Sequence, residues 1–525
     1  MRKGHGITML FMVLTMLSAG IAADIVVPPN TQNALATAIA AAASGDVLLL
    51  ARGGYYGNQG TVTVPANIAI TLKATGTGPR PVVFQIAPAG GVYAVRDFQL
   101  NGPSFTALGI HFDADHGDAS WTRYGLSSGV ANIVLRFDSC AFSNFFGRTI
   151  DLLTADNKVF ITNCIFSGDV KRTGFDEGRP IDARQFGHDT IFVQNTTFLN
   201  VTDRFFRHYT GTGYLPLDVV IFDHCTFAYG YGYRPGFQFG MIKKLQFTNN
   251  ILLDPGMMGT ESVTIRKNEV DYAEKDIRIF SAVKVDSLGT VIQMLNNNMY
   301  VEQSILDIFA AHADSSAPAP WFNAEFKSKI DSTKAMFQEV LTFSNLPATS
   351  IPGAPGAPLP VITAFAHSPR TAITATLMNL RHPDSINFAY STSAQSYTKG
   401  GAGFPVGDLN WFPARKAAWI AAGKPTTSVG TAGSTVPAQF NLTQNYPNPF
   451  NPTTTIEFTL SENSNVSLKI FDVLGREVAA LVDGEMKSGI IHQVQFDASK
   501  LSSGLYFYRL DAGTNSQVKK LVLMK

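Results

Sequence analysis

Four arginines recur at similar intervals in the middle of the chain and are the first candidates for chemistry. The intervals are 31, 25 and 30 residues, and the arginines are Arg148, Arg179, Arg204 and Arg234. Three positions after each arginine stand, in order, Asp151, Asp182, Arg207 and Phe237. A guanidinium binds a carboxylate through two parallel hydrogen bonds. If the intervals are structural repeats, the arginines form a column that suits an acidic polysaccharide such as a uronan.

Residues near this column suggest both binding and catalysis. Tyr231 and Tyr233 offer rings on which sugars can stack. A lyase that acts on a uronan neutralises the sugar carboxylate and removes the proton next to it, which a carboxylate-bound Ca²⁺ and a basic side chain can do together. In that interpretation Asp151 and Asp182 are the Ca²⁺ ligands, and Arg207 or His208 is the base.

Two other interpretations of the same residues stay open. A glycoside hydrolase needs two carboxylates, and Asp151 and Asp182 one repeat apart fit the shorter, retaining separation. Alternatively, arginines beside aspartates on successive repeats form a ladder of structural ion pairs and bind no substrate. A surface adhesin or glycan-binding scaffold without catalysis is also consistent with the pattern.

Side chains so far apart in sequence align only if the chain is built from repeated coils. A six-residue frame recurs as "FDSCAF", "ITNCIF", "VQNTTF", "FDHCTF", "FTNNIL" and "MLNNNM". Its fourth residue is always small or amide-bearing, and the intervals between these residues are 24, 32, 29, 25 and 47. The last interval is expected to hold two coils, with residues 265–270 as a weak intermediate. A period of this size predicts a solenoid, and units rich in β-branched and aromatic residues predict strands stacked about 4.8 Å apart. Cys225 of "FDHCTF" is then a ladder residue, not a catalytic thiol.

The frame resembles the asparagine-ladder turn of right-handed parallel β-helices of the pectate-lyase-like class. The resemblance covers about residues 25–345, and residues 35–57 read as the Ala-rich cap helix, Gly-Asp turn and first coil of that class. It implies an all-β protein with a right-handed parallel β-helix over residues 24–345. The class includes lyases, hydrolases, epimerases and non-catalytic adhesins, so the fold leaves the activity open.

The remaining segments form a closing region and a second domain. Residues 321–345 have helical spacing and are expected to flank the far end of the solenoid, and residues 346–422 to close it, packed on or after the β-helix. A polar linker spans 423–438. Residues 439–525 alternate with period two, which predicts a small immunoglobulin-like antiparallel β-sandwich. Their "YPNPFNPTT", "FDVLGREV" and "SSGLYFYRL" segments resemble the C-terminal sorting domain of type IX secretion substrates. This implies the type IX secretion machinery as a partner and an extracellular or cell-surface location.

Composition and the N-terminus agree with export. Residues 1–23 read as a secretory signal peptide, and no later apolar run is long enough to span a membrane. The formal net charge is +1, with 41 basic and 40 acidic residues, which argues against a nucleic-acid partner. Three cysteines are too few for a disulfide framework.

Overall fold

The computed structural model forms two compact units, residues 1–428 and 429–525, which are described separately. The predicted signal peptide, 1–23, lies almost wholly outside the described residues and stays a prediction. The described residues are 22–87, 91–116, 122–169, 177–209, 215–230, 236–256, 278–283, 285, 288–311, 318–345, 386–424, 441–442, 445, 448, 450–460, 463–486, 492–513 and 515–524.

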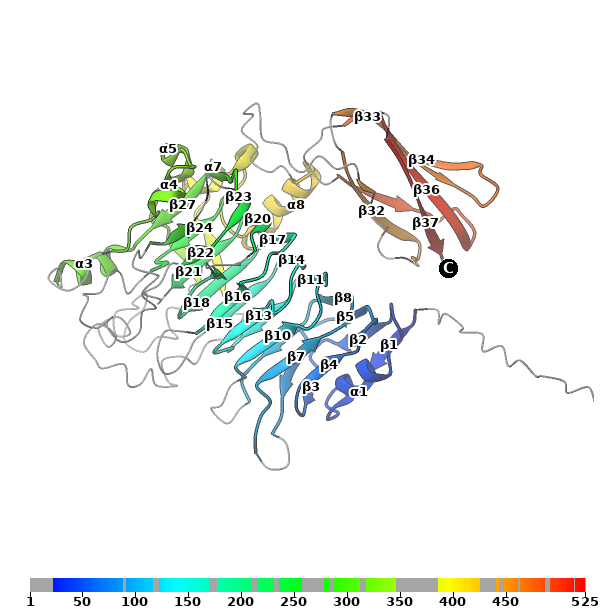
Figure 1. Ribbon diagram of the computed structural model, residues 1–525, viewed down its shortest axis with the longest axis horizontal. Helices are drawn as coiled ribbons and strands as arrows, with labels where there is room; N and C mark the ends of the chain where they lie inside the picture. Colours follow the sequence, from blue (N-terminus) through cyan, green and yellow to red (C-terminus); the bar gives the residue numbers. More distant parts are fainter. Residues whose placement is uncertain are drawn as a thin grey trace, which may run out of the picture. The chain divides into compact units, whose positions relative to one another are not determined.

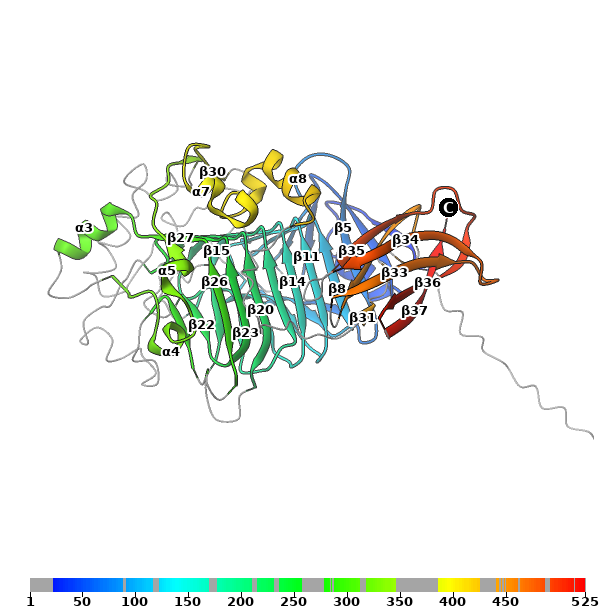
Figure 2. The ribbon, with the colours of Figure 1, turned by 90° about the horizontal axis from the view of Figure 1, so that it is seen from above.

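The first unit is a parallel β-helix, as the repeat predicted. Three parallel sheets of ten, ten and eight strands run its length, and each of the eight complete coils contributes one strand to each sheet (Figures 1 and 2). Sheet 1 contains β1 (Asp24–Val27), β2 (Val47–Ala51), β5 (Ile70–Thr75), β8 (Ser104–Leu108), β11 (Val134–Asp138), β14 (Lys158–Thr162), β17 (Thr190–Gln194), β20 (Leu217–Asp223), β23 (Ile242–Thr248) and β26 (Val291–Leu295). Sheet 2 contains β3 (Tyr55–Asn58), β6 (Val82–Gln85), β9 (His111–Asp113), β12 (Ala141–Ser143), β15 (Ile165–Asp169), β18 (Thr197–Val201), β21 (Thr226–Gly230), β24 (Ile251–Leu253), β27 (Asn297–Tyr300) and β28 (Met336–Phe337). Sheet 3 contains β4 (Val62–Val64), β7 (Arg96–Leu100), β10 (Tyr124–Ser128), β13 (Arg148–Asp151), β16 (Arg179–Arg184), β19 (Phe206–His208), β22 (Phe237–Phe239) and β25 (Phe280–Ala282).

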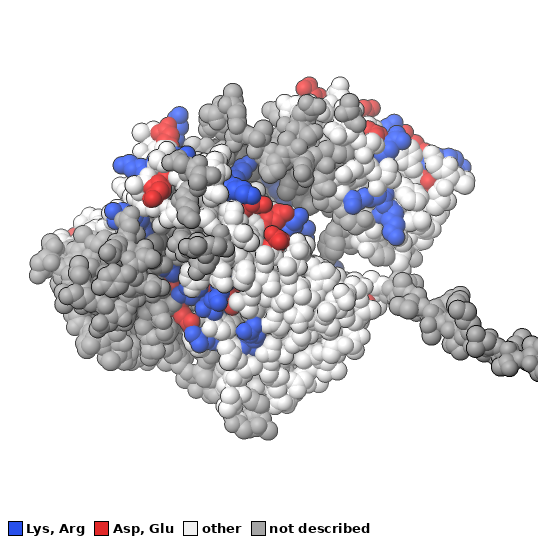
Figure 3. Space-filling model, in the orientation of Figure 1, with Lys and Arg blue, Asp and Glu red and all other residues white. Residues whose placement is uncertain are grey.

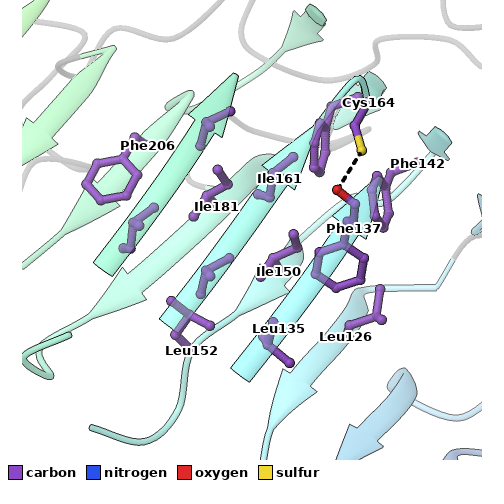
Figure 4. Close-up of a cluster of buried hydrophobic side chains, with 14 of the residues drawn as sticks. Leu126, Leu135, Phe137, Phe142, Ile150, Leu152, Ile161, Cys164, Ile181 and Phe206 are labelled. Atoms are coloured by element: carbon purple, nitrogen blue, oxygen red, sulfur yellow. Dashed lines mark hydrogen bonds between the residues drawn. The ribbon is translucent and has the colours of Figure 1, made fainter. Parts of the chain in front are cut away.

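Alternate side chains of the three sheets fill the space between them. Figure 4 shows Leu126, Ile150 and Ile161 among the apolar side chains of this core. Aromatic rings stack from coil to coil, and Phe142 and Phe166 have centroids 4.5 Å apart. In stacked coils of this kind, each buried side chain packs against a similar side chain of the next coil. This packing fixes the strand register along the solenoid.

The six-residue frame forms the corner between sheets 1 and 2. The residue before each ladder position has φ between 48° and 59°, a left-handed conformation that favours asparagine and tolerates histidine and serine. Its members are Ser139, Asn163, Asn195, His224, Asn249 and Asn296. The ladder residues themselves are buried, and the Oδ1 of Asn250 accepts the N–H of Cys225 at 2.8 Å. The sulfur atoms of the ladder cysteines lie next to carbonyl oxygens one coil back, as Cys164 Sγ does to Phe137 O at 3.6 Å (Figure 4).

The expectation of two coils in the last interval is wrong. β24 pairs directly with β27, with Ile251 opposite Asn298, so the interval of 47 residues is a single coil. The extra length lies in an insertion whose residues 257–277, including the supposed intermediate 265–270, are outside the described part of the chain.

Helices and short strands close the two ends of the β-helix. Helix α1 (Ala34–Ala41) packs on β1, β3 and β4, as expected of a cap. Helix α3 (Gln303–Ala311) follows β27. The helical spacing of 321–345 gives two short helices, α4 (Ala324–Lys327) and α5 (Ser332–Ala335), and then β28 and β29 (Phe343–Asn345). Asn323 and Asp331 are the N-cap residues at which these two helices begin, and β28, which follows α5, pairs with β27 of sheet 2.

A closing segment, residues 386–424, packs along the corner between sheets 1 and 2. The N–H of Gly407 donates to the carbonyl of Asn249 at 2.7 Å, and Lys416 Nζ donates to Asn163 Oδ1 at 2.6 Å. The rest of the predicted closing region, 346–385, lies outside the described residues. The elements of the segment are β30 (Asn387–Tyr390), α7 (Ser396–Lys399), η4 (Gly401–Gly403), η5 (Leu409–Trp411) and α8 (Pro413–Ala421).

The second unit is an antiparallel β-sandwich, as predicted. A three-stranded sheet in the order β31-β32-β35 and a four-stranded sheet in the order β34-β33-β36-β37 share one apolar core, which includes Phe458 and Tyr508. Its strands are β31 (Asn441–Leu442), β32 (Thr453–Thr459), β33 (Ser464–Phe471), β34 (Glu477–Met486), β35 (His492–Asp497), β36 (Gly504–Ala512) and β37 (Asn515–Leu523). Among the described residues of both units, no helix is long and apolar enough to cross a membrane.

Candidate functional site

The predicted columns of charged side chains lie on sheet 3. Register places Arg148 opposite Arg179 and Asp151 opposite Asp182, and Asp182 in turn opposite Arg207. Sequence spacing therefore aligned these residues correctly. The prediction of Phe237 as the fourth member of the second column is wrong, because Gln238 stands opposite Arg207.

Phe237 is displaced by one position from its predicted place. It pairs with Phe206, and its ring stacks on Phe280 at 4.8 Å inside the core. An inward position of a β-helix strand requires an apolar side chain, so the core determines this register and not the distance from Arg234. Arg234, Tyr231 and Tyr233 lie outside the described residues.

Asp182 is the centre of the cluster. Arg207 donates to both of its oxygens, through Nε at 3.0 Å to Oδ1 and through a terminal nitrogen to Oδ2. Arg148 Nε lies 2.8 Å from Oδ2, and a terminal nitrogen of Arg179 lies 3.7 Å from it. Burial alone raises the pKa of Asp182, but Arg207 and Arg179 outweigh it and lower the pKa to about 2. Asp182 in return raises the pKa of Arg207, against the effect of burial.

A second carboxylate holds the deeper arginines. Asp203 accepts a hydrogen bond from Nε of Arg179 and lies 3.6 Å from a terminal nitrogen of Arg204. All three residues are buried. Arg179 and Arg204 therefore form the buried inner part of the cluster.

The rim of the cluster is partly exposed. Arg123, whose side chain is 44% exposed, donates two hydrogen bonds to Glu177 at 2.6 and 2.9 Å. The guanidiniums of Arg123 and Arg148 lie 5.0 and 4.7 Å from the ring centre of Tyr124. Figure 3 shows basic and acidic side chains gathered on the surface over β10, β13 and β16.

Sequence reasoning missed the start of the arginine column. Tyr124 stands opposite both Arg148 and Arg96, so Arg96 continues the column two coils toward the N-terminus. Arg96 is part-exposed, donates to Gln99 Oε1 at 2.5 Å, and has no carboxylate partner among the described residues. The intervals of 28 and 24 residues from Arg96 to Tyr124 to Arg148 were the available signal.

Asp151 is the least well paired carboxylate of the cluster. It is 1% exposed, and its Oδ1 has no hydrogen-bond partner among the described residues. Its nearest cations are Arg148 at 3.6 Å and Arg184 at 4.0 Å. Burial and the neighbouring charge of Asp182 raise its pKa to about 6.

His208 is oriented differently from the arginines. It is fully buried, and its Nδ1 accepts the N–H of Met241 at 3.3 Å. Burial and the neighbouring His188 lower its pKa to about 4, so the ring is neutral at pH 7.

The cluster does not fit a Ca²⁺ site. Both oxygens of Asp182 accept from Arg207, and the nearest charged neighbours of Asp151 are guanidiniums. Calcium requires several oxygen ligands, with net negative charge, around one point. In the part of the chain that the structure describes, no group of three His, Cys, Asp or Glu side chains could hold a metal ion.

Comparison with known proteins identifies the second unit. Residues 444–524 match the family described as "Secretion system C-terminal sorting domain". The chain therefore carries a type IX sorting domain, which implies interaction with the secretion machinery and export to the cell surface or extracellular space.

The β-helix unit has more distant likenesses. No curated protein sequence matches the chain. A solved structure entitled "Structure of PL6 family alginate lyase AlyGC" is similar, at 15% identity and a TM-score of 0.29. The similar region covers 44% of this chain and 36% of that protein.

Proposed function

We propose that the β-helix unit binds an acidic polysaccharide outside the cell, on the charged surface of sheet 3. The observation that carries the proposal is that, among the described residues, guanidiniums outnumber carboxyl groups on successive coils of one sheet. The guanidiniums belong to Arg96, Arg123, Arg148, Arg179, Arg184, Arg204 and Arg207, and the carboxyl groups to Asp97, Asp151, Asp182, Asp203 and Glu177.

The rim arginines are suited to contact the polymer. Arg96 and Arg148 are two coils apart in one column, and a coil rises by about 4.8 Å, which is on the scale of one sugar residue. A polyuronate lying along the solenoid axis presents a carboxylate at each residue. The deeper arginines add positive potential, which attracts a polyanion at long range. Tyr231 and Tyr233 stay proposed as sugar-stacking residues.

Cleavage by β-elimination is the second candidate, and Asp151 is the observation that favours it. In this reaction a base takes the proton from C5 of a uronate, a double bond forms between C4 and C5, and the bond from C4 to the glycosidic oxygen breaks. The leaving oxygen takes up a proton. A carboxylate whose pKa is raised to about 6 is a stronger base than an ordinary aspartate and is still ionised at pH 7.

Arg207 and His208 fit the base less well than Asp151 does. Pairing with Asp182 keeps the guanidinium of Arg207 protonated, and a base must be unprotonated. His208 is neutral, but its Nδ1 already accepts a main-chain hydrogen bond. We therefore assign Arg207 to binding and positioning within the proposed site.

Hydrolysis is less favoured than elimination. Neighbouring carboxyls with pKa values near 6 and near 2 resemble a general acid and a nucleophile. However, both oxygens of Asp182 accept hydrogen bonds from Arg207, which commits this carboxylate to the arginine and makes it a poor nucleophile toward a sugar.

A binding experiment with matched variants tests the proposal. Purified protein is titrated with a polyuronate and with a neutral dextran of similar length. We expect binding of the polyuronate only, weakening with salt, and a loss of at least about tenfold in affinity for Arg96→Ala and Arg148→Ala. The control is Arg136→Ala, because Arg136 is an exposed arginine stacked on Phe160 of sheet 1. Equal binding of dextran, or equal losses in the control, would overturn the proposal.

Catalysis is read in the same samples. Elimination produces unsaturated uronates that absorb in the ultraviolet, and hydrolysis produces reducing ends without that absorbance. Binding with neither product identifies a glycan-binding or adhesive protein and rejects both enzymatic candidates.

A further inference from the structure

An aromatic pair lies beside the N-terminal end of the charged surface. The rings of Tyr93 and His116 stack with centroids 3.6 Å apart and planes 17° apart. Tyr93 precedes β7 of sheet 3, and His116 follows β9 of sheet 2. Both residues are part-exposed, so the pair is not a core contact.

The segment that carries Tyr93 exposes apolar surface. Val92 and Val95 are 79% and 57% exposed. The two exposed valines flank Tyr93 in the sequence, and exposed apolar side chains grouped in this way are typical of binding sites.

Buried hydrogen bonds fix the position of this segment. Gln85, which is 1% exposed, accepts the N–H of Ala94 at 3.0 Å and donates to its carbonyl at 3.2 Å. The same amide nitrogen donates to Asp97 Oδ1 at 2.6 Å. The main chain next to Tyr93 is thus held in place before any ligand arrives, which lowers the entropic cost of binding.

The pair is connected to the rim of the charged surface through single residues. His116 Nε2 lies 2.9 Å from Thr122 Oγ1, and Thr122 directly precedes Arg123. On the other side, the carbonyl of Val95 accepts the N–H of Tyr124 at 3.0 Å, and Arg96 follows Val95. Apolar and aromatic surface therefore adjoins two rim guanidiniums.

We propose that Tyr93, supported by His116, is a stacking platform for a pyranose ring of the acidic polysaccharide. This rests on the proposed function and extends its site toward the first coils. The face of an aromatic ring is electronegative and attracts the C–H groups on the face of a sugar. A sugar on the platform places its carboxylate within the reach of Arg96 or Arg123, so the platform selects a uronic acid over a neutral hexose.

The test measures the affinity of a purified oligouronide for the full chain and six variants. Tyr93→Ala removes the ring and is expected to weaken binding at least about fivefold, whereas Tyr93→Phe keeps the ring and the affinity. Val92 is almost fully exposed, so its replacement leaves folding intact. If the polyanion passes over the platform, Val92→Glu weakens binding and Val92→Lys strengthens it.

A tyrosine elsewhere on the coils provides the control. Tyr55 on β3 is 57% exposed, and Tyr55→Ala is expected to leave the affinity unchanged. Oligouronide binding that is unaltered by Tyr93→Ala and by both Val92 variants, yet weakened by Arg148→Ala, overturns the platform and leaves the charged surface standing. Absence of oligouronide binding by the unaltered protein overturns the charged surface and the platform together.

Discussion

Replacing Asp151 by asparagine separates a functional cluster from a purely structural ladder of ion pairs. The folded protein holds the pKa of this carboxyl at about 6, compared with an ordinary value of 3.8. Because the folded pKa is raised, the folded state binds more protons than the unfolded state between these pH values. Stability therefore falls as pH rises from 3.8 to 6, and the full penalty is present at pH 7.

The size of the effect follows from the difference in pKa. A difference of about two units corresponds to ~3 kcal/mol of unfolding free energy. The asparagine variant loses this penalty, but its new amide N–H groups must find acceptors in a buried position, which offsets part of the gain. We expect Asp151→Asn to stabilise the β-helix unit by about 1–3 kcal/mol at pH 7 and to have no stabilising effect near pH 4.

Tryptophan fluorescence during urea unfolding measures this change in one unit of the chain. The four tryptophans, Trp121, Trp321, Trp411 and Trp419, all belong to the β-helix unit, so the sorting domain does not contribute to the signal. Unfolding free energies of both proteins are compared at pH 7 and pH 4.

Asp182→Asn is the matched control, because it changes the same chemical group one coil away. Asp182 neutralises Arg207, Arg148 and Arg179, so its loss leaves buried guanidiniums uncompensated and is expected to cost about 3–5 kcal/mol at pH 7. If Asp151→Asn also destabilises the protein at pH 7 by a similar amount, Asp151 is a structural ion-pair partner and the reasoning about its raised pKa is refuted.

Three further predictions concern the histidines, the ladder and calcium. Burial lowers the pKa of His188 and His208 to about 4, so the unfolding free energy falls as pH is lowered from 6.5 to 4 and the unfolded chain takes up protons first. The His188→Gln variant should lose less unfolding free energy over that pH range than the unaltered protein, and an equal loss contradicts the assignment. Asn250→Ala leaves the N–H of Cys225 without its acceptor and should lower the unfolding free energy, measured in urea, by about 2–4 kcal/mol. Cys225→Thr should lower it by under about 1 kcal/mol, because threonine already fills this ladder position at residue 196. Removal of calcium with a chelator should leave the affinity for a polyuronate, measured by calorimetry, unchanged. A loss of affinity that added Ca²⁺ restores would show that the charge argument against a calcium site is wrong.

The sequence predicted the fold well because a solenoid repeats one physical requirement in every coil. The corner before each ladder residue needs a left-handed backbone, so Asn163, His224 and Asn249 recur there, and the ladder position needs a small side chain. The pattern failed where a coil carries a long insertion. Between Asn250 and Asn297 the interval resembles two coils, yet strand pairing shows one, because an insertion between β24 and β25 does not alter the stacking of the coils on either side.

The candidate site was predictable in its alignment but not in its pairing. Equal spacing placed Arg148 opposite Arg179 and Asp151 opposite Asp182, since register propagates along a parallel sheet. Which cation each carboxylate binds depends on side-chain direction and burial, and the sequence contains neither. Arg207 was thus interpreted as a base, although its guanidinium is committed to Asp182.

The energetics of the cluster argue for a bound anion. A structural ladder is most stable when each buried cation meets a carboxylate, because an unpaired buried charge costs several kcal/mol. Sheet 3 departs from this in two ways: its guanidiniums outnumber its carboxylates among the described residues, and burial makes the ionised form of Asp151 less stable than that of an ordinary aspartate. Natural proteins keep such local costs mainly where function requires them. The acidic polysaccharide that we propose would offset the surplus positive charge at the rim, where Arg96 has no carboxylate partner among the described residues, and would leave the pairing around Asp182 in place.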